Sequence, residues 1–171
     1  MDYKEHITII EDYPTEGIQF KDITPLLQNG PAYRSAILEM SEYVKERKAD
    51  IIVGPEARGF VVGCPIAFQL EKSFVPVRKA GKLPRKVVQA DYGLEYGNDT
   101  LAIHEDSIKP GDRVIITDDL LATGVLLKRR LSSLKSSVAK WLAVHFSLNL
   151  AYIDSRSKIK DYDVFSLISY K

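Results

Sequence analysis

The stretch RVIITDDLLATG, residues 113–124, decides the fold class. Its apolar, β-branched run Val114–Ile116 predicts a short buried strand, and two adjacent aspartates follow directly. Strands that are apolar throughout are typical of parallel sheets with both faces covered. In such sheets ligands bind beyond the carboxyl ends of the strands, so Asp118 and Asp119 are candidate site residues.

Strand-like and helix-like segments alternate along the rest of the chain. We expect strands at 50–54, 73–79, 112–117 and 163–170, a helix after Pro31 with Tyr33, Ile37, Met40 and Val44 at helical spacing, and a long excursion or hairpin at 80–100. Short apolar strands separated by helices predict an α/β fold with a mostly parallel central sheet flanked by helices. A length of 171 residues suits a single domain that covers 1–171.

Composition argues against several classes of protein. A net charge of +1 does not suit a general nucleic-acid or membrane-surface protein, and no apolar run reaches the roughly 18 to 20 residues of a membrane span. The acidic start MDYKEHITII does not resemble a signal peptide. Cys64 is the only cysteine, so we expect no internal disulfide and a cytoplasmic location. Because Cys64 lies in an apolar segment, we expect a core position for this thiol rather than a nucleophilic role. The scattered histidines His6, His104 and His145 receive no metal role.

Charged residues follow three of the predicted strands. PEARGF comes after 50–54, RKAGK after 73–77, and DDLLATG after 112–117. Taken singly, the acids could cap a helix, Arg58 could be a surface residue, and the lysines could form a solvated turn. Taken together, the acids can accept from hydroxyls, while loop amides and the bases Arg58, Arg78, Lys79 and Lys82 can hold phosphate. The convergence predicts a site for an anionic ligand with hydroxyls, such as a phosphorylated sugar.

Several longer motifs resemble a known family. VGPEARGF, RKAGKLPRKV, DYGLEYGNDTLAIHEDSIKPGDRV and ITDDLLATG together resemble adenine phosphoribosyltransferases, of the type I phosphoribosyltransferase family. DYPTEGIQFKDITPLL, near the N-terminus, is similar to the segment that lies on the adenine side of those enzymes. The resemblance covers residues 1–124 almost continuously and resumes at about 150–170.

The resemblance implies a reaction of purine salvage. Adenine and phosphoribosyl pyrophosphate would give AMP and pyrophosphate, with Mg²⁺ bound mainly through substrate phosphates and ribose. The resemblance also implies a type I phosphoribosyltransferase fold with a mobile lid or hairpin, and a homodimer.

The resemblance further implies a part for each site residue. Asp118 and Asp119 would bind the ribose hydroxyls; the loop Ala122, Thr123, Gly124, Val125 and Leu126 would hold the 5′-phosphate; and Arg78, Lys79 and Lys82 would neutralise pyrophosphate. Arg58, a catalytic residue, would lie with its neighbours 56–59 near the base and pyrophosphate, in a turn where the family often has a cis non-proline peptide. Phe20, with the backbone around Gln19 and Lys21, would recognise adenine. Glu95, on the 80–100 lid, would be the general acid/base at the purine nitrogen, and Tyr96 would close over the site.

The resemblance is interrupted after Gly124. The family normally continues with a second glycine and a threonine, whereas this chain has Val125 and Leu126, and the whole segment 125–149 departs from the family although both flanks match it. One hypothesis is a reading-frame shift, opened by one lost base and closed by one gained, because codons chosen for this segment can be re-read as the expected loop, an acidic helix and an apolar strand. The alternative is real divergence with weakened 5′-phosphate binding. The nucleotide sequence of the gene distinguishes the two.

Two other functions stay open. A related phosphoribosyltransferase could act on another base, and a weakly active or non-catalytic protein could bind AMP or phosphoribosyl pyrophosphate as a regulator. The intact LEYG motif argues against the second of these. Formation of AMP from adenine separates all three.

Overall fold

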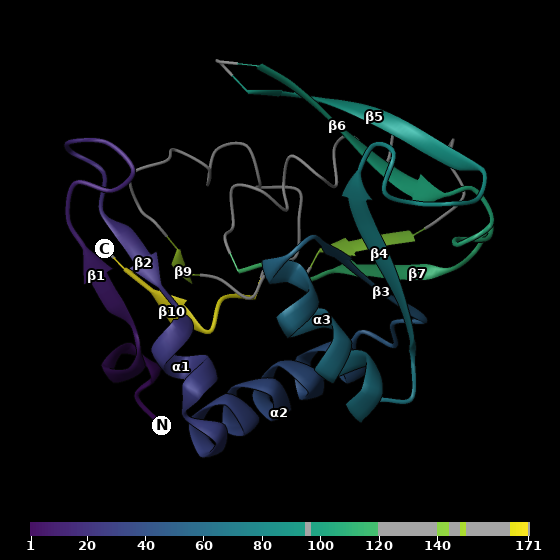
Figure 1. The fold of residues 1–171 in the computed structure, drawn as a ribbon. Coiled ribbons are helices and arrows are strands. Elements are labelled where there is room, and N and C mark those ends of the chain that lie inside the picture. Colours follow the sequence, from purple (N-terminus) through teal and green to yellow (C-terminus); the bar gives the residue numbers. More distant parts are fainter. Residues whose placement is uncertain (95–96, 120–139, 144–147, 150–164, 171) are drawn as a thin grey trace.

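The fold is an α/β arrangement around one mixed sheet (Figure 1). The computed structural model describes residues 1–94, 97–119, 140–143, 148–149 and 165–170. Its elements in chain order are η1 (Tyr3–His6), β1 (Thr8–Ile10), β2 (Phe20–Asp22), α1 (Thr24–Gln28), α2 (Gly30–Glu46), β3 (Ile51–Pro55), α3 (Arg58–Gln69), β4 (Ser73–Lys79), β5 (Val87–Leu94), β6 (Gly97–His104), β7 (Arg113–Ile116), β8 (Lys140–Ala143), β9 (Leu148–Asn149) and β10 (Ile168–Ser169).

The central sheet has six strands in the order β5-β6-β4-β3-β7-β8. The neighbours β4, β3, β7 and β8 run parallel, while β6 is antiparallel to both β4 and β5. This confirms the mostly parallel central sheet and the strands predicted at 50–54, 73–79 and 112–117. The predicted excursion at 80–100 contains a hairpin, which extends further along the chain, to His104. The strand predicted at 163–170 was too long, because only Ile168–Ser169 is a strand within 165–170.

The two faces of the sheet belong to two separate apolar clusters. Ile52 and Ile115 point to the side that carries α2 and α3, where they are fully buried with residues of both helices. The alternate residues Val53, Val114 and Ile116 point to the other side and pack with residues of β4 and β6. Because side chains alternate along a strand, strands with both faces covered must be apolar at every position, as these are.

The helix α2 begins where the sequence predicts. The Asn29 side chain accepts a hydrogen bond from the backbone N–H of Ala32 at 3.1 Å, and Pro31 lies in the first turn, where a missing N–H costs nothing. Buried Ala36, Met40 and Val44 then lie on the face turned to the core.

The helix α3 contains Pro65, which cannot donate a backbone hydrogen bond to the carbonyl four residues earlier. That carbonyl belongs to Val61, and it accepts instead from the hydroxyl of Tyr33 in α2. Burial raises the pKa of Tyr33, so the hydroxyl keeps its proton for this bond. A side chain of one helix thus satisfies the backbone group that the proline leaves open in the other.

Two glycines let α3 lie very close to the sheet. A Cβ at Gly59 would fall 2.4 Å from Pro55 Cδ and 2.9 Å from the carbonyl oxygen of Thr117. A Cβ at Gly63 would fall 2.5 Å from both Thr117 Oγ1 and a ring carbon of Phe74. The start of α3 is therefore held against the end of β7, the strand that precedes the two aspartates.

A smaller layer of short strands flanks the central sheet. β1 and β2 form an antiparallel pair, and β9 and β10 form a short parallel pair (Figure 1). The sequence did not predict β1 or β2. The three residues of β1 are all exposed, so they lack the apolar run that marks a buried strand.

The prediction that Cys64 belongs to the core is wrong. Its thiol is exposed, because the neighbours Val62 and Ile66 occupy the buried face of α3 and position 64 lies on the opposite one. Among the described residues, no helix is long and apolar enough to span a membrane.

Candidate active site

The carboxyl ends of β4, β3 and β7 meet at one edge of the sheet. The parallel pairing matches Pro55 with Val77 and Val53 with Ile116, so the segments after the three strands start side by side. Two ion-pair clusters link these segments. One joins Arg58 to Asp119, and the other joins Glu56 to Arg78 and Lys82. The predicted convergence of the charged residues after the three strands is therefore confirmed.

Asp118 and Asp119 are buried although both carry carboxylates. Asp119 Oδ2 accepts from Arg58 Nε at 2.9 Å, and Asp118 Oδ1 accepts from the backbone N–H of Asp119 at 2.9 Å. Asp118 Oδ2 is buried, and among the described residues no group forms a hydrogen bond with it. A buried acceptor without a partner is costly unless a ligand supplies a donor, and a sugar hydroxyl is such a donor.

The two aspartates titrate as an interacting pair. Burial, and next the charge of Asp119, raise the pKa of Asp118 well above the ordinary range of an aspartate. Burial also raises the pKa of Asp119, while the Arg58 guanidinium opposes that rise. Arg58 therefore pairs directly with Asp119, while its charge is the last of the causes that act on the pKa of Asp118 and lowers that pKa only in part.

Arg58 connects this pair to the N-terminal flank. Its side chain is 47% exposed, and the guanidinium carbon lies 5.6 Å from the ring centroid of Phe20 in β2. The peptide bond Glu56–Ala57, just before Arg58, is cis, as the resemblance implied for this turn. The aromatic ring expected at the adenine and the acids expected at the ribose thus lie on either side of one arginine.

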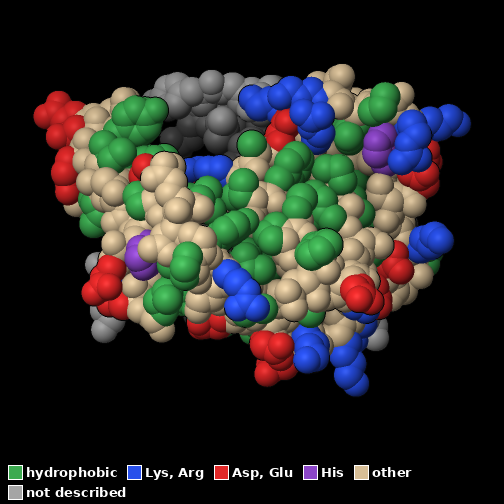
Figure 2. All heavy atoms as spheres, turned by 60° about the horizontal axis from the view of Figure 1, so that its bottom comes forward, with side chains coloured by type: hydrophobic (Ala, Val, Ile, Leu, Met, Phe, Trp, Pro, Cys, Tyr) green, Lys and Arg blue, Asp and Glu red, His purple; other side chains and the backbone are tan. Residues whose placement is uncertain are grey.

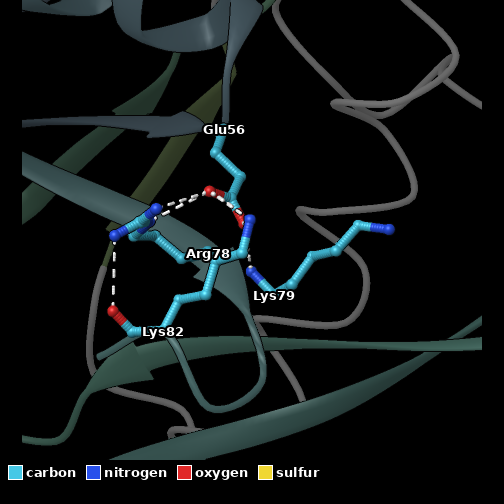
Figure 3. Close-up of polar contacts among 4 residues, drawn as sticks. All are labelled: Glu56, Arg78, Lys79 and Lys82. Atoms are coloured by element: carbon cyan, nitrogen blue, oxygen red, sulfur yellow. Dashed lines mark hydrogen bonds and ion pairs between the residues drawn. The ribbon is translucent and has the colours of Figure 1, made fainter. Parts of the chain in front are cut away.

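Glu56 is the centre of the second cluster (Figure 3). Its Oε2 accepts from Arg78 Nε at 3.0 Å, and its Oε1 accepts from the backbone N–H of Lys79 at 2.8 Å and pairs with Lys82 Nζ at 3.2 Å. Burial acts to raise the pKa of Glu56, but the hydrogen bonds from Lys79, Arg78 and Lys82 outweigh it and lower the pKa below its usual value. The carboxylate is ionised and holds the loop that follows β4.

The remaining predicted residues fall into two groups. Lys21 is 4% exposed. Its ammonium donates to Gln19 Oε1 at 2.9 Å and lies over the ring of Tyr170. This side chain therefore faces the protein, and only the backbone of Lys21 stays a candidate adenine contact. Residues outside the described part of the chain are Glu95, Tyr96, Ala122, Thr123, Gly124, Val125 and Leu126. The segment 125–149 also lies outside it, except for β8 and β9.

Sequence reasoning did not identify the bonding role of Glu56. A usable signal was present, since an acid directly after one parallel strand and a base directly after its neighbour come together when the strands are in register. Pairing of Pro55 with Val77 fixes that register, but the register cannot be read from either strand alone.

Comparisons with known proteins agree with this geometry. Residues 22–169 match the phosphoribosyl transferase domain family. The adenine phosphoribosyltransferase of Thermoanaerobacter pseudethanolicus is 41% identical, with 99% of this chain and 98% of that chain covered and a TM-score of 0.85. The chain belongs to the adenine phosphoribosyltransferase family.

Two further adenine phosphoribosyltransferases have been solved with ligands. The enzyme of Saccharomyces cerevisiae, in complex with an imino-altritol bisphosphate and adenine, is 36% identical over 98% of this chain and 97% of that chain, with a TM-score of 0.84. The enzyme of Giardia lamblia, in complex with 9-deazaadenine, is 29% identical over 99% and 97%, with a TM-score of 0.86. The family resemblance therefore extends over the full length of the chain.

Proposed function

We propose that this site forms AMP and pyrophosphate from adenine and phosphoribosyl pyrophosphate, in purine salvage. The observation that carries the proposal is the buried Asp118–Asp119 pair with its open acceptor, joined through Arg58 to the ring of Phe20. Adenine in the yeast enzyme and 9-deazaadenine in the Giardia enzyme support adenine as the base.

Asp118 and Asp119 receive the ribose hydroxyls in this proposal. A purine nitrogen forms a bond to the anomeric carbon, the bond from that carbon to pyrophosphate breaks, and the proton of the nitrogen passes to Glu95. The anomeric carbon gains positive character on the way, and the buried, anionic Asp119 beside it favours that charge. Phe20 offers its ring face to the base.

Pyrophosphate leaves toward the cationic side, which is formed by Arg78 and Lys79 at the end of β4 and by Lys82 after it. Tyr96 would close over the reactants, and the loop from Ala122 to Leu126 would hold the 5′-phosphate. Mg²⁺ would bind mainly through substrate oxygens, and its charge would help to stabilise the leaving pyrophosphate. The open oxygen of Asp118 can accept a hydrogen bond from a ribose hydroxyl or from a water of the hydrated ion. Within the described residues, no three His, Cys, Asp or Glu side chains group to hold a metal by themselves.

A homodimer is also proposed, with α3 in its interface. Cys64, Pro65 and Phe68 follow helical spacing on the outer side of α3, and Phe68 is 88% exposed. Figure 2 shows hydrophobic side chains gathered on the face that carries α2 and α3. Phe68→Asp should shift the mass in analytical ultracentrifugation from dimer to monomer, and an unchanged mass would place the interface elsewhere. The free, exposed thiol of Cys64 supports a reducing cytoplasm as the location.

The decisive experiment is AMP formation from adenine and phosphoribosyl pyrophosphate with Mg²⁺. Activity with adenine, and little with guanine or hypoxanthine, is expected. Preference for another base would indicate a phosphoribosyltransferase that acts on that base. Binding of AMP without turnover would favour a regulator. Mass analysis of peptides from 125–149, beside the gene sequence, identifies which version of the phosphate loop the assayed protein carries.

A further inference from the structure

The hairpin formed by β1 and β2 has one buried side chain, and that side chain is a lysine. Within residues 8–22 only Lys21 is buried, at 4% exposure. Its ammonium donates to Gln19 Oε1 at 2.9 Å and lies 4.9 Å from the centroid of the Tyr170 ring. Both partners are neutral and leave the charge uncompensated, so this ammonium costs more to bury than an apolar side chain would. The lysine at this position therefore points to a role other than stability.

The Lys21 ammonium is the inner end of a chain of side-chain hydrogen bonds. Gln19 Oε1 accepts from Lys21, and Gln19 Nε2 donates to Glu11 Oε1 at 2.9 Å. Glu11 follows β1 and Gln19 precedes β2, directly beyond the last backbone pair of the hairpin, Ile10 with Phe20. A cation at the amide oxygen and an anion at the amide nitrogen together fix the orientation of the Gln19 side chain. These bonds close the end of the hairpin.

The end of the hairpin determines where the ring of Phe20 lies. Because side chains alternate along a strand, Lys21 faces the protein and Phe20 faces the opposite way, with its ring centroid 5.6 Å from the guanidinium carbon of Arg58. The loop between the strands returns to the same ring, since Tyr13 packs edge-on against Phe20 with the centroids 5.3 Å apart. The bonds on the inner side of β2 thus hold the strand that carries this aromatic pair on its outer side (Figure 1).

We infer that the Lys21 side chain is a positioning group for the base: through Gln19 it fixes the end of the β1–β2 hairpin, so that Phe20 lies where the base binds. The inference rests on the proposed function, because it takes Phe20 as a contact of the base. The ammonium itself does not touch the base, since it lies on the other side of β2.

A structural lysine and a positioning lysine predict different results for Lys21→Met. Methionine keeps the length of the side chain and a favourable contact with the Tyr170 ring, but it removes the charge and the donor to Gln19. If Lys21 only supports the fold, the melting temperature falls and every ligand binds more weakly. If Lys21 positions the hairpin, the melting temperature is unchanged or higher, because the cost of burying the charge is gone, and only binding of the base suffers.

The experiment titrates AMP and ribose 5-phosphate into the full-length protein by calorimetry, because the two ligands differ only in the base. For Lys21→Met we expect AMP affinity to fall about tenfold, a factor typical for the loss of a hydrogen bond to a charged group, with ribose 5-phosphate affinity unchanged. Gln19→Leu breaks the same bond from its other end and should show the same selective loss. The double variant should be no weaker than either single variant, because both act through one bond.

Lys4→Met is the matched control. The Lys4 ammonium lies over the same Tyr170 ring, at 5.4 Å, but Lys4 is exposed, so its replacement should leave both affinities unchanged.

Three results overturn the inference. They are full AMP affinity in Lys21→Met, an equal fall in both affinities, and a wild type that binds AMP no better than ribose 5-phosphate. If Lys21→Met does not fold, Gln19→Leu decides alone, and full AMP affinity in that variant overturns the inference as well. Since calorimetry needs no turnover, a wild type that binds AMP without forming it from adenine would refute the proposed function and leave this test valid.

Discussion

Asp118 shows how one atom links the fold to the chemistry. Its Oδ2 is buried and has no hydrogen-bond partner within the described part of the chain, while its Oδ1 accepts from the backbone N–H of Asp119. The neighbouring Asp119 adds a like charge, and Arg58 forms its ion pair with Asp119. The folded protein therefore holds an unfavourable arrangement that a sugar with two hydroxyls would relieve, which is common where binding residues are placed for a ligand rather than for stability.

Asp118→Asn should consequently stabilise the free protein while it impairs the reaction. At pH 7 we expect the free energy of unfolding to rise by about 1 to 3 kcal/mol, because the substitution removes a buried negative charge beside Asp119, and we expect AMP formation to fall at least about tenfold. Chemical denaturation measures the first quantity and the coupled assay the second. A less stable variant at pH 7 would mean that the aspartate pair is net favourable in the folded state.

The gain in the free energy of unfolding from Asp118→Asn should also depend on pH. Because the folded-state pKa of Asp118 is raised, the folded protein retains this proton at pH values where the unfolded chain has lost it. Stability from this group is thus fully present below the ordinary aspartate pKa, about 4, and is lost as pH rises through the folded-state value. Denaturation curves should converge for variant and wild type near pH 4 and separate towards neutral pH. A gap that is constant with pH would contradict the assignment.

At the scale of elements, the closeness of α3 to β7 determines the site. Gly59 and Gly63 both face Thr117, which donates to the carbonyl of Val53 through its backbone N–H at 2.8 Å and directly precedes the aspartates. With any larger residue α3 would have to move outward, and Arg58 at its start would move away from Asp119. Packing and catalysis therefore depend on the same two glycines.

Gly63→Ala tests this dependence. The added methyl would meet Thr117 Oγ1 and Phe74 at 2.5 Å, so we expect a loss of about 1 to 3 kcal/mol in the free energy of unfolding, together with lower activity. Gly30→Ala is the control, because nothing lies within 4 Å of its Cβ and it starts α2. It should be neutral or more stable by about 0.4 to 1 kcal/mol. Equal effects of the two substitutions would show that close packing at α3 is not the cause.

The same elements show how far the sequence alone could lead. Val114–Ile116 predicted a buried strand because every position is apolar, and parallel pairing then implied that charged residues after three strands meet. The position of Cys64 was missed because a helix with small residues on several sides does not reveal which one faces the core. The bonds of Glu56 were missed because they depend on register between strands, which is a tertiary property.

At the scale of the whole molecule, the two ends of the chain meet beside the proposed adenine side. The ammonium groups of Lys21 and Lys4 lie 4.9 Å and 5.4 Å from the ring centroid of Tyr170, which follows β10. No sequence pattern predicted this contact, since the residues that form it are far apart along the chain. Lys21 directly follows Phe20 in β2, so the C-terminal end contacts the strand that carries the aromatic ring.

Tyr170→Leu should therefore affect adenine more than phosphoribosyl pyrophosphate. Loss of the ring leaves the buried ammonium of Lys21 with its hydrogen bond to Gln19 Oε1, and a cation–π contact is worth about 0.5 to 2 kcal/mol. We expect a lower melting temperature and a higher Michaelis constant for adenine, because β2 loses an anchor next to Phe20. Tyr170→Phe keeps the ring face and should behave as wild type. If both Michaelis constants rise equally, the ring does not act through β2, and the general stability of the C-terminal end is responsible. If Tyr170→Phe is as impaired as Tyr170→Leu, the hydroxyl is responsible and not the ring face.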